Sequence, residues 1–91
     1  MNKTFLLLAL LSLAAGCAVT QGRERCGALL DSAWKELDVA KAEGFAGAVS
    51  HGKAAALLAH AKGQQTLERY PSCIEAADKA RFYISESRKG R

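Results

Sequence analysis

The 91-residue sequence has little of what larger or more extended proteins need. It contains one proline, and 7% of its residues are aromatic, while 49% are hydrophobic and 24% are charged. This composition argues against a disordered tail, a coiled-coil rod or a multi-span membrane protein, and it fits a helical domain. The length leaves room for one small domain and excludes folds of about 150 residues or more, such as dinucleotide-binding sheets and α/β barrels.

Sequence motifs that carry catalysis or metal binding are also missing. There is no Cys-x-x-Cys pair, no Gly-x-Ser-x-Gly turn, no glycine-rich phosphate loop and no convincing strand pattern. His51 and His60 are nine residues apart on one predicted helix, which puts them on opposite faces where they cannot share a metal ion. We therefore expect no cofactor, no metal and no small-molecule substrate, and predict that the chain is not an enzyme. A small enzyme that uses one of these histidines is kept as a third hypothesis.

The spacing of apolar residues predicts three helices, at residues 24–43, 50–69 and 73–88. In the first, apolar residues recur at alternating spacings of four and three, which forms one stripe along a helix. The other two helices carry comparable stripes. The expected inner positions are Cys26, Leu30, Ala33, Leu37 and Ala40, then Ala54, Leu57, Leu58 and Ala61, and finally Cys73, Ala76, Ala77, Ala80, Tyr83 and Ile84.

Local signals predict where these helices end. Gly44 is expected to cap the first helix, and residues 44–48 to connect it to the second. Pro71 is expected to end the second helix, because the residue before a proline avoids the α region. Ser72 and Glu75 have the spacing of a capping box at the start of the third.

Two glycines interrupt the second predicted helix. Gly52 and Gly63 each cost about 1 kcal/mol of helix propensity relative to alanine. We expect them to serve the close approach of a neighbouring helix, since neither has a side chain to hold two backbones apart.

Helices of this length with short connections predict an all-α fold, an up-down-up three-helix bundle over residues 24–88. The first and third helices then run parallel, so Cys26 and Cys73 begin their helices at the same end of the bundle. A core of this size, lined mostly by alanine, is expected to be marginal without a covalent cross-link.

The N-terminal residues have the three parts of a secretory signal. Lys3 precedes an apolar segment at residues 5–15, and small residues follow. As a helix this segment rises about 16 Å, which is too short to cross a hydrocarbon core of ~30 Å. It is therefore read as an export signal at residues 1–16 and not as a transmembrane anchor.

Residues 13–17, Leu-Ala-Ala-Gly-Cys, resemble the lipobox of bacterial lipoproteins. The resemblance implies that Cys17 is diacylated, that the chain is cut before it, and that residues 17–23 tether the bundle to a membrane. Because Ala18 follows the cysteine, with no aspartate there, it also implies sorting to the outer membrane, facing the periplasm. The alternative is cleavage after Ala18 by ordinary signal peptidase, which would give a soluble secreted protein.

Cysteine parity agrees with the lipobox. Three cysteines in an exported chain leave one unpaired. If Cys17 carries lipid, Cys26 and Cys73 remain and can form a disulfide in an oxidising compartment. The other interpretation of these two residues is a pair of buried free thiols.

A wider resemblance is to the short, alanine-rich, three-helix lipoproteins of proteobacteria whose function is unknown. It rests on Ala-Trp-x-x-Leu-x-x-Ala-Lys-Ala at residues 33–42, Lys-Ala-Ala-x-Leu-Leu at 53–58 and Tyr-Pro-x-Cys-Ile-x-x-Ala-x-x-Ala-Arg at 70–81. It implies a periplasmic helical adaptor, with an envelope protein or peptidoglycan as partner. The Trp-x-x-Leu at 34–37 also resembles a tetratricopeptide helix, but the later positions of that repeat do not match, so the chain is not a true repeat of that kind.

Charged residues and two aromatic residues supply the remaining candidates. Removal of Lys3 with the signal lowers the formal net charge from +4 to +3, and an exported chain does not meet nucleic acid. The basic tail at residues 89–91 is expected to point away from the membrane. The candidate interaction residues are Trp34, Phe82, Arg88, Lys89 and Arg91. The simpler interpretations are the edge of the core for Trp34 and a solvated, frayed end for the tail. Phe82 is a candidate contact if it is exposed, and a bend in the bundle or packing beneath the tether would hide it instead.

The sequence thus predicts a non-enzymatic, membrane-anchored periplasmic lipoprotein that acts as a small adaptor or envelope component. The alternative is a soluble periplasmic helical protein, such as an inhibitor or a stress factor.

Overall fold

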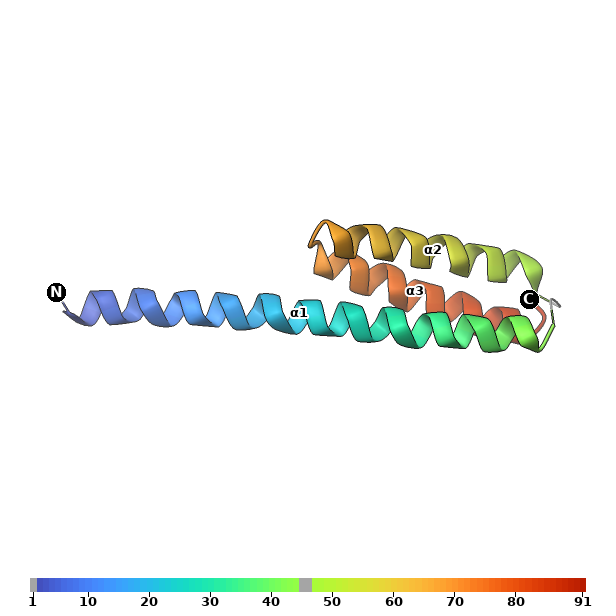
Figure 1. The fold of residues 1–91 in the computed structure, drawn as a ribbon, viewed down its shortest axis with the longest axis horizontal. Coiled ribbons are helices and arrows are strands. Elements are labelled where there is room, and N and C mark those ends of the chain that lie inside the picture. Colours follow the sequence, from blue (N-terminus) through green and yellow to red (C-terminus); the bar gives the residue numbers. More distant parts are fainter. Residues whose placement is uncertain (1, 45–46) are drawn as a thin grey trace.

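The computed structural model describes residues 2–44 and 47–91, and their side chains from residue 19 onward. It contains helices α1 (Asn2–Ala42), α2 (Ala48–Thr66) and α3 (Tyr70–Arg88). α1 and α3 run in the same direction and α2 runs against them, while the first half of α1 extends beyond the other two helices (Figure 1). The predicted all-α, up-down-up bundle is confirmed.

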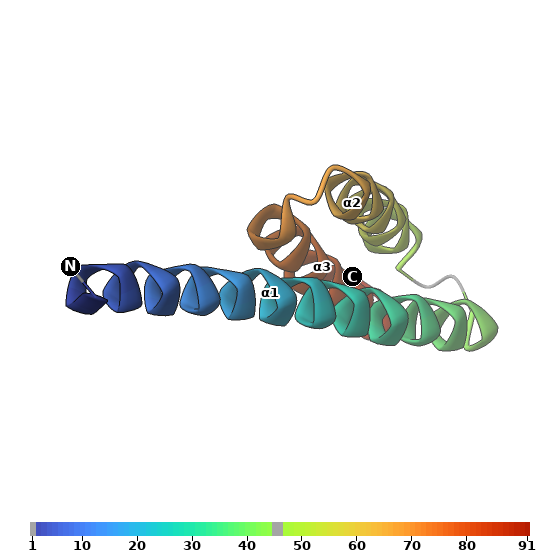
Figure 2. The same ribbon diagram turned by 60° about the vertical axis from the view of Figure 1, so that its left-hand side comes forward.

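The third helix holds the bundle together. α3 packs against both α1 and α2, whereas α1 and α2 contact each other least. In Figure 2, α1 and α2 lie on different sides of α3. The buried apolar residues form one cluster, and eight of its fourteen members were expected from α1 and α2: Cys26, Leu30, Ala33, Leu37, Ala40, Ala54, Leu58 and Ala61.

The inner face of α3 is also largely as expected. Cys73, Ala76, Ala77, Ala80 and Ile84 are buried. Leu57 and Tyr83, which were expected inside, are only partly buried and pack against the edge of the core. α3 supplies a sixth core residue that the sequence pattern did not predict, Tyr70, which is 7% exposed.

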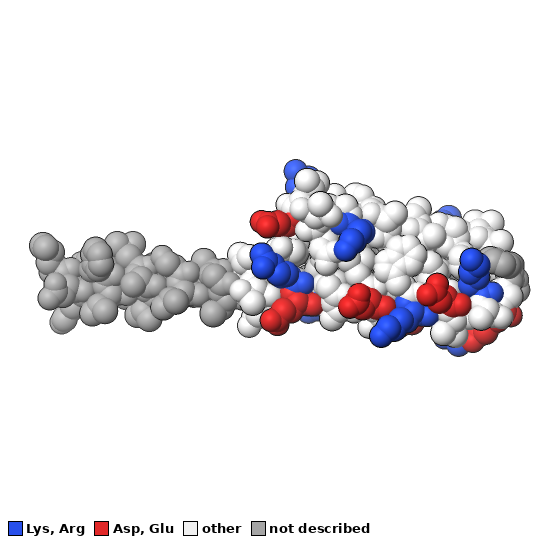
Figure 3. All heavy atoms as spheres, viewed as in Figure 1, with Lys and Arg blue, Asp and Glu red and all other residues white. Residues whose placement is uncertain are grey.

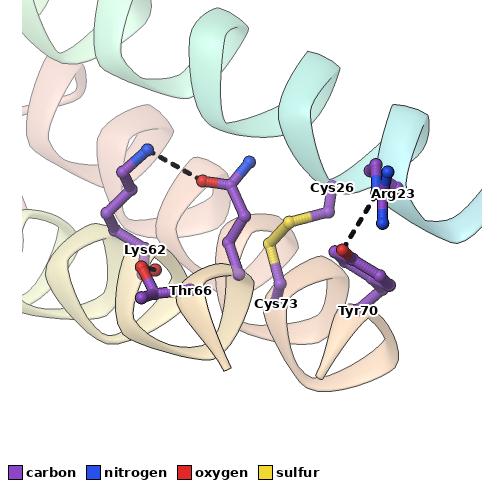
Figure 4. Close-up of a disulfide and its surroundings, with 7 residues drawn as sticks. Arg23, Cys26, Lys62, Thr66, Tyr70 and Cys73 are labelled. Carbon is purple, nitrogen blue, oxygen red and sulfur yellow. Dashed lines mark hydrogen bonds between the residues drawn. A yellow bond between two sulfur atoms is a disulfide. The ribbon is translucent and has the colours of Figure 1, made fainter. Parts of the chain in front are cut away.

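A disulfide joins Cys26 of α1 to Cys73 of α3, with their Cα atoms 5.7 Å apart. Both side chains are fully buried. Figure 4 shows the bridge between the two helices. The predicted pairing is therefore confirmed, and the interpretation as two free thiols is wrong. The bridge spans 47 positions of the sequence, and closing a loop of that length stabilises the fold by about 4 kcal/mol in the chain-entropy treatment.

The segment expected to be an irregular tether is helical. α1 is continuous through residues 17–23, ahead of the predicted start at residue 24. This part of α1 passes close to the start of α3, since a Cβ built on Gly22 would lie 3.2 Å from Cβ of Tyr70. A side chain at this position would crowd Tyr70, and glycine avoids that contact. The side chains of residues 2–18, including that of Cys17, lie outside the described part of the chain.

The α2–α3 connection corrects a second expectation. α2 ends at Thr66, where the amide of Glu68 bonds to the carbonyl of Gln65 and the amide of Arg69 to that of Gln64. These are the two hydrogen bonds of a Schellman motif, with Glu68 in the left-handed conformation at φ 58°.

α3 then starts at Tyr70, with Pro71 in its first turn. Proline is favoured there because its missing N–H has no partner in the first turn of a helix. The predicted capping box is wrong, since Arg69 is the N-cap residue and no side chain caps the helix.

The glycines within α2 do not have the role expected of them. A Cβ added at Gly52 or at Gly63 would meet no atom within 4 Å. The close approach occurs at Gly47, whose added Cβ would lie 2.6 Å from Cα of Ser87. Gly44 ends α1 at φ 116°, as predicted, although residues 45–46 of the connection lie outside the described part.

Candidate functional site

The surface around the start of α3 is the best-defined candidate site, and we call it the proximal end. It comprises residues 19–25 of α1, the turn at 67–69 and the first residues of α3 at 70–74. These three segments meet where α1 leaves the bundle (Figure 1). The Cys26–Cys73 disulfide lies directly beneath it and fixes α1 to α3 (Figure 4).

Arg23 and Tyr70 form the polar part of the proximal end. Nε of Arg23 donates a 3.1 Å hydrogen bond to the Tyr70 hydroxyl, and the guanidinium carbon lies 5.8 Å from the centre of the phenol ring. The hydrogen bond to Tyr70 is the main cause that raises the pKa of Arg23 above its ordinary value. Arg23 therefore stays charged at any physiological pH and keeps its other N–H groups for a further acceptor.

Apolar side chains border this pair. A pocket of about 400 Å³ is lined by Val19, Gly22, Glu68, Tyr70, Pro71 and Ile74. Val19 is 54% exposed, and Leu67 in the adjoining turn is 60% exposed. The proximal end thus presents apolar side chains beside a fixed cation.

A second surface, between α1 and α3, is charged but internally neutralised. Arg81 bonds both oxygens of Glu36, at 3.0 and 3.3 Å. One heptad further along, Arg88 bonds both oxygens of Glu43, at 2.8 and 3.0 Å. The hydrogen bond to Glu43 is the main cause that raises the pKa of Arg88. Figure 3 shows acidic and basic side chains interleaved along α1.

The basic tail is held in place. Gly90, at φ 80°, and Arg91 close a second Schellman motif onto the carbonyls of Ser87 and Glu86. The Arg91 main-chain oxygen accepts a 2.6 Å hydrogen bond from Ser50 Oγ at the start of α2. The tail lies at the opposite end of the bundle from the proximal end, as expected (Figure 1).

All three basic candidates of this region lie near carboxylates. Lys89 and Arg91 pair with Glu86 at 3.7 and 3.4 Å, and Arg88 pairs with Glu43. The structure therefore brings these three cations together, but as partners of acidic side chains of the same bundle. Residues 89–91 are therefore bonded to the bundle and do not form a frayed end.

The two aromatic candidates lie on different surfaces. Trp34 is 40% exposed and lines a groove between α1 and α2 with Leu30, Lys62 and Gln65. Phe82 is 59% exposed on α3 and stacks edge-on against Tyr83, with 5.3 Å between the ring centres. Phe82 thus meets the condition of exposure on which it was a candidate contact residue, and Trp34 lies between α1 and α2 with part of its surface exposed.

The described residues hold no group of three histidine, cysteine or acidic side chains that could bind a metal ion. His60 is exposed, and it lines a small pocket with Glu75 and Lys79. Within the same described part, no helix combines the length and the apolar character needed to cross a membrane.

No protein-family model matches this chain, and neither a curated protein nor a solved structure is significantly similar to it. The structure establishes a small three-helix protein with a disulfide between Cys26 and Cys73.

Sequence reasoning missed two long-range contacts that shape the ends of the bundle. Arg23–Tyr70 and Ser50–Arg91 each join residues more than 40 positions apart. No spacing rule links such residues. The burial of Ser50 and Tyr70 follows only from how α2 and α3 start, which depends on the turns before them.

Proposed function

We propose that this protein is a non-enzymatic lipoprotein, anchored through lipid on Cys17 in the outer membrane and facing the periplasm. Its three-helix bundle acts as a small adaptor or structural component of the envelope. The partner is an envelope protein or peptidoglycan, contacted through exposed side chains such as Phe82 and Trp34.

The observation that carries the proposal is the Cys26–Cys73 disulfide. Disulfides persist in exported proteins and are rare in the cytosol, so the bridge favours export, as the signal-like residues 1–16 do. It also uses two of the three cysteines and leaves Cys17, in its lipobox-like setting, as the one to be modified. The three-helix bundle by itself is compatible with many functions.

Intact mass spectrometry of the native protein, alkylated without reduction, tests both points at once. We expect a chain that begins at Cys17, carries the mass of acyl chains and takes up no alkylating reagent. An unacylated chain that begins at Val19 would contradict the anchor and support the alternative, a soluble periplasmic protein released after Ala18.

Membrane fractionation gives the matched control. Wild-type protein should sediment with the outer membrane, and Cys17→Ser should lose that location while keeping the Cys26–Cys73 bridge. Cross-linking in the intact envelope then tests the adaptor role. We expect Phe82→Ala or Trp34→Ala to lose a cross-linked partner that Lys35→Ala, on the exposed face of α1, retains.

A further inference from the structure

We propose that the proximal end is a membrane-contacting surface that rests on an anionic phospholipid layer. Leu67 and Val19 would enter the interface between headgroups and acyl chains, and Arg23, Arg25 and Arg69 would bind lipid phosphates. This inference rests on the proposed anchoring and adds an orientation to it, because a tethered bundle need not touch its membrane at all.

The apolar part of the argument comes from side chains that the bundle leaves uncovered. Leu67 is 60% exposed at the tip of the α2–α3 turn, and Val19 is 54% exposed on the adjoining turn of α1. Pro71 and Ile74 line the pocket that Val19 also lines. An apolar tip flanked by cations is the pattern of segments that lie in a membrane interface.

The arginines supply the second, independent part. Arg23, Arg25 and Arg69 are all exposed, and none of them forms an ion pair with a described carboxylate. By contrast, the arginines of the α1–α3 face are each held by two carboxylate oxygens. Glu24 and Glu68 also lie at the proximal end and leave it a net charge of +1. The attraction therefore depends on individual guanidinium groups and not on a strong overall field.

The contact between Arg23 and Tyr70 organises this charge. Because Tyr70 accepts from Nε, the two terminal nitrogens of the guanidinium remain for another acceptor. A guanidinium group binds phosphate oxygens through parallel hydrogen bonds, which suits a lipid phosphate.

The position of the proximal end favours a membrane as the surface that it contacts. Cys17 lies on the part of α1 that continues from this end of the bundle, so a lipid on Cys17 would bring the proximal end to a bilayer. Five positions of α1 lead from Cys17 to Gly22, where α1 meets Tyr70. In the continuous helix they rise about 7.5 Å, comparable to the polar headgroup zone on one side of a bilayer.

A tryptophan placed at Leu67 tests the contact. The acylated protein is extracted from the envelope and reconstituted into vesicles of phosphatidylethanolamine and phosphatidylglycerol with bromine on the upper acyl carbons. Trp34→Phe removes the native signal, and Leu67→Trp is compared with Val49→Trp, which labels the opposite end at a residue that is 72% exposed. We expect blue-shifted and strongly quenched emission from Leu67→Trp only.

The contribution of charge is tested in the same vesicles. Arg25→Gln combined with Arg69→Gln should reduce the quenching of Leu67→Trp, and the control Lys35→Gln combined with Lys41→Gln should leave it unchanged. Vesicles of phosphatidylcholine should give weaker quenching than those with phosphatidylglycerol. Equal results for both variants, or for both lipids, would overturn the role of the arginines.

The two proposals fail in different ways. A native chain without acyl mass contradicts the anchoring itself and removes this inference with it. An acylated chain in which Leu67→Trp is as exposed to water as Val49→Trp contradicts the membrane contact alone and leaves the anchor in place.

Discussion

The backbone of Gly47 lies directly against the backbone of Ser87, so that a Cβ atom on Gly47 would be 2.6 Å from Cα and 2.7 Å from the carbonyl oxygen of Ser87. This contact joins the start of α2 to the last turn of α3. Both residues are buried. Because the neighbouring atoms belong to a helix backbone, they cannot turn away as a flexible side chain could.

Gly47→Ala is therefore expected to destabilise the fold by about 1–3 kcal/mol, the usual cost of an overpacked contact. The φ angle of Gly47 is −113°, so alanine meets no conformational penalty there and the cost is steric. Urea unfolding followed by circular dichroism measures it. A variant with wild-type stability would contradict the close approach.

Gly52→Ala and Gly63→Ala are expected to have the opposite effect. Neither added methyl group meets another atom within 4 Å, and alanine is the better helix former by about 1 kcal/mol. Each variant should raise the melting temperature by about 4–8 °C, given the size of the domain. A loss of stability at either site would mean that α2 packs closer to a neighbour than the structure describes.

Removal of the disulfide is expected to cost more than any of these substitutions. Cys26→Ser combined with Cys73→Ser should lower the free energy of unfolding by about 4 kcal/mol, because the open chain regains the entropy of a long loop. A core built largely from alanine buries little apolar surface, so the rest of the fold contributes little stability to replace the bridge. Urea unfolding of the double variant, and of the wild type with and without a reductant, should show the same large shift in midpoint. Unchanged midpoints would contradict a structural role for the bridge.

Helical periodicity predicted the core well, and the helix ends poorly. The stripe of Cys26, Leu30 and Ala33 is visible in the sequence because helical packing repeats every three or four residues. The start of α1 was predicted too late because residues 18–23 have no apolar repeat, although α1 is helical there.

The turn before α3 shows the same limit. Pro71 and Ser72 satisfy two rules that favour different helix starts, a proline in the first turn and a capping box. The Schellman motif at the end of α2 decides between them, and it places a glutamate where glycine is usual. No local rule would have put Glu68 in a left-handed conformation.

Glu68→Gly is accordingly expected to stabilise the protein. A residue with a Cβ atom costs about 1–2 kcal/mol in the left-handed region, and glycine avoids that cost. The control is Glu68→Ala, which removes the same carboxylate but keeps the Cβ atom. We expect the glycine variant to melt higher than the alanine variant, and equal melting temperatures would show that the turn relaxes elsewhere.

Substitution of Phe82 can separate an effect on partner binding from an effect on the stability of the fold. Its ring is 59% exposed and touches Tyr83 at the edge of the core, so Phe82→Ala removes little buried area. We expect it to change the free energy of unfolding by no more than about 0.5–1 kcal/mol, within the range of surface substitutions and a single aromatic pair. Ile84→Ala, which empties a fully buried position two residues away, should cost about 2–5 kcal/mol and serves as the contrast. If Phe82→Ala proved as costly as Ile84→Ala, the ring would have to be part of the core and could not be offered to a partner.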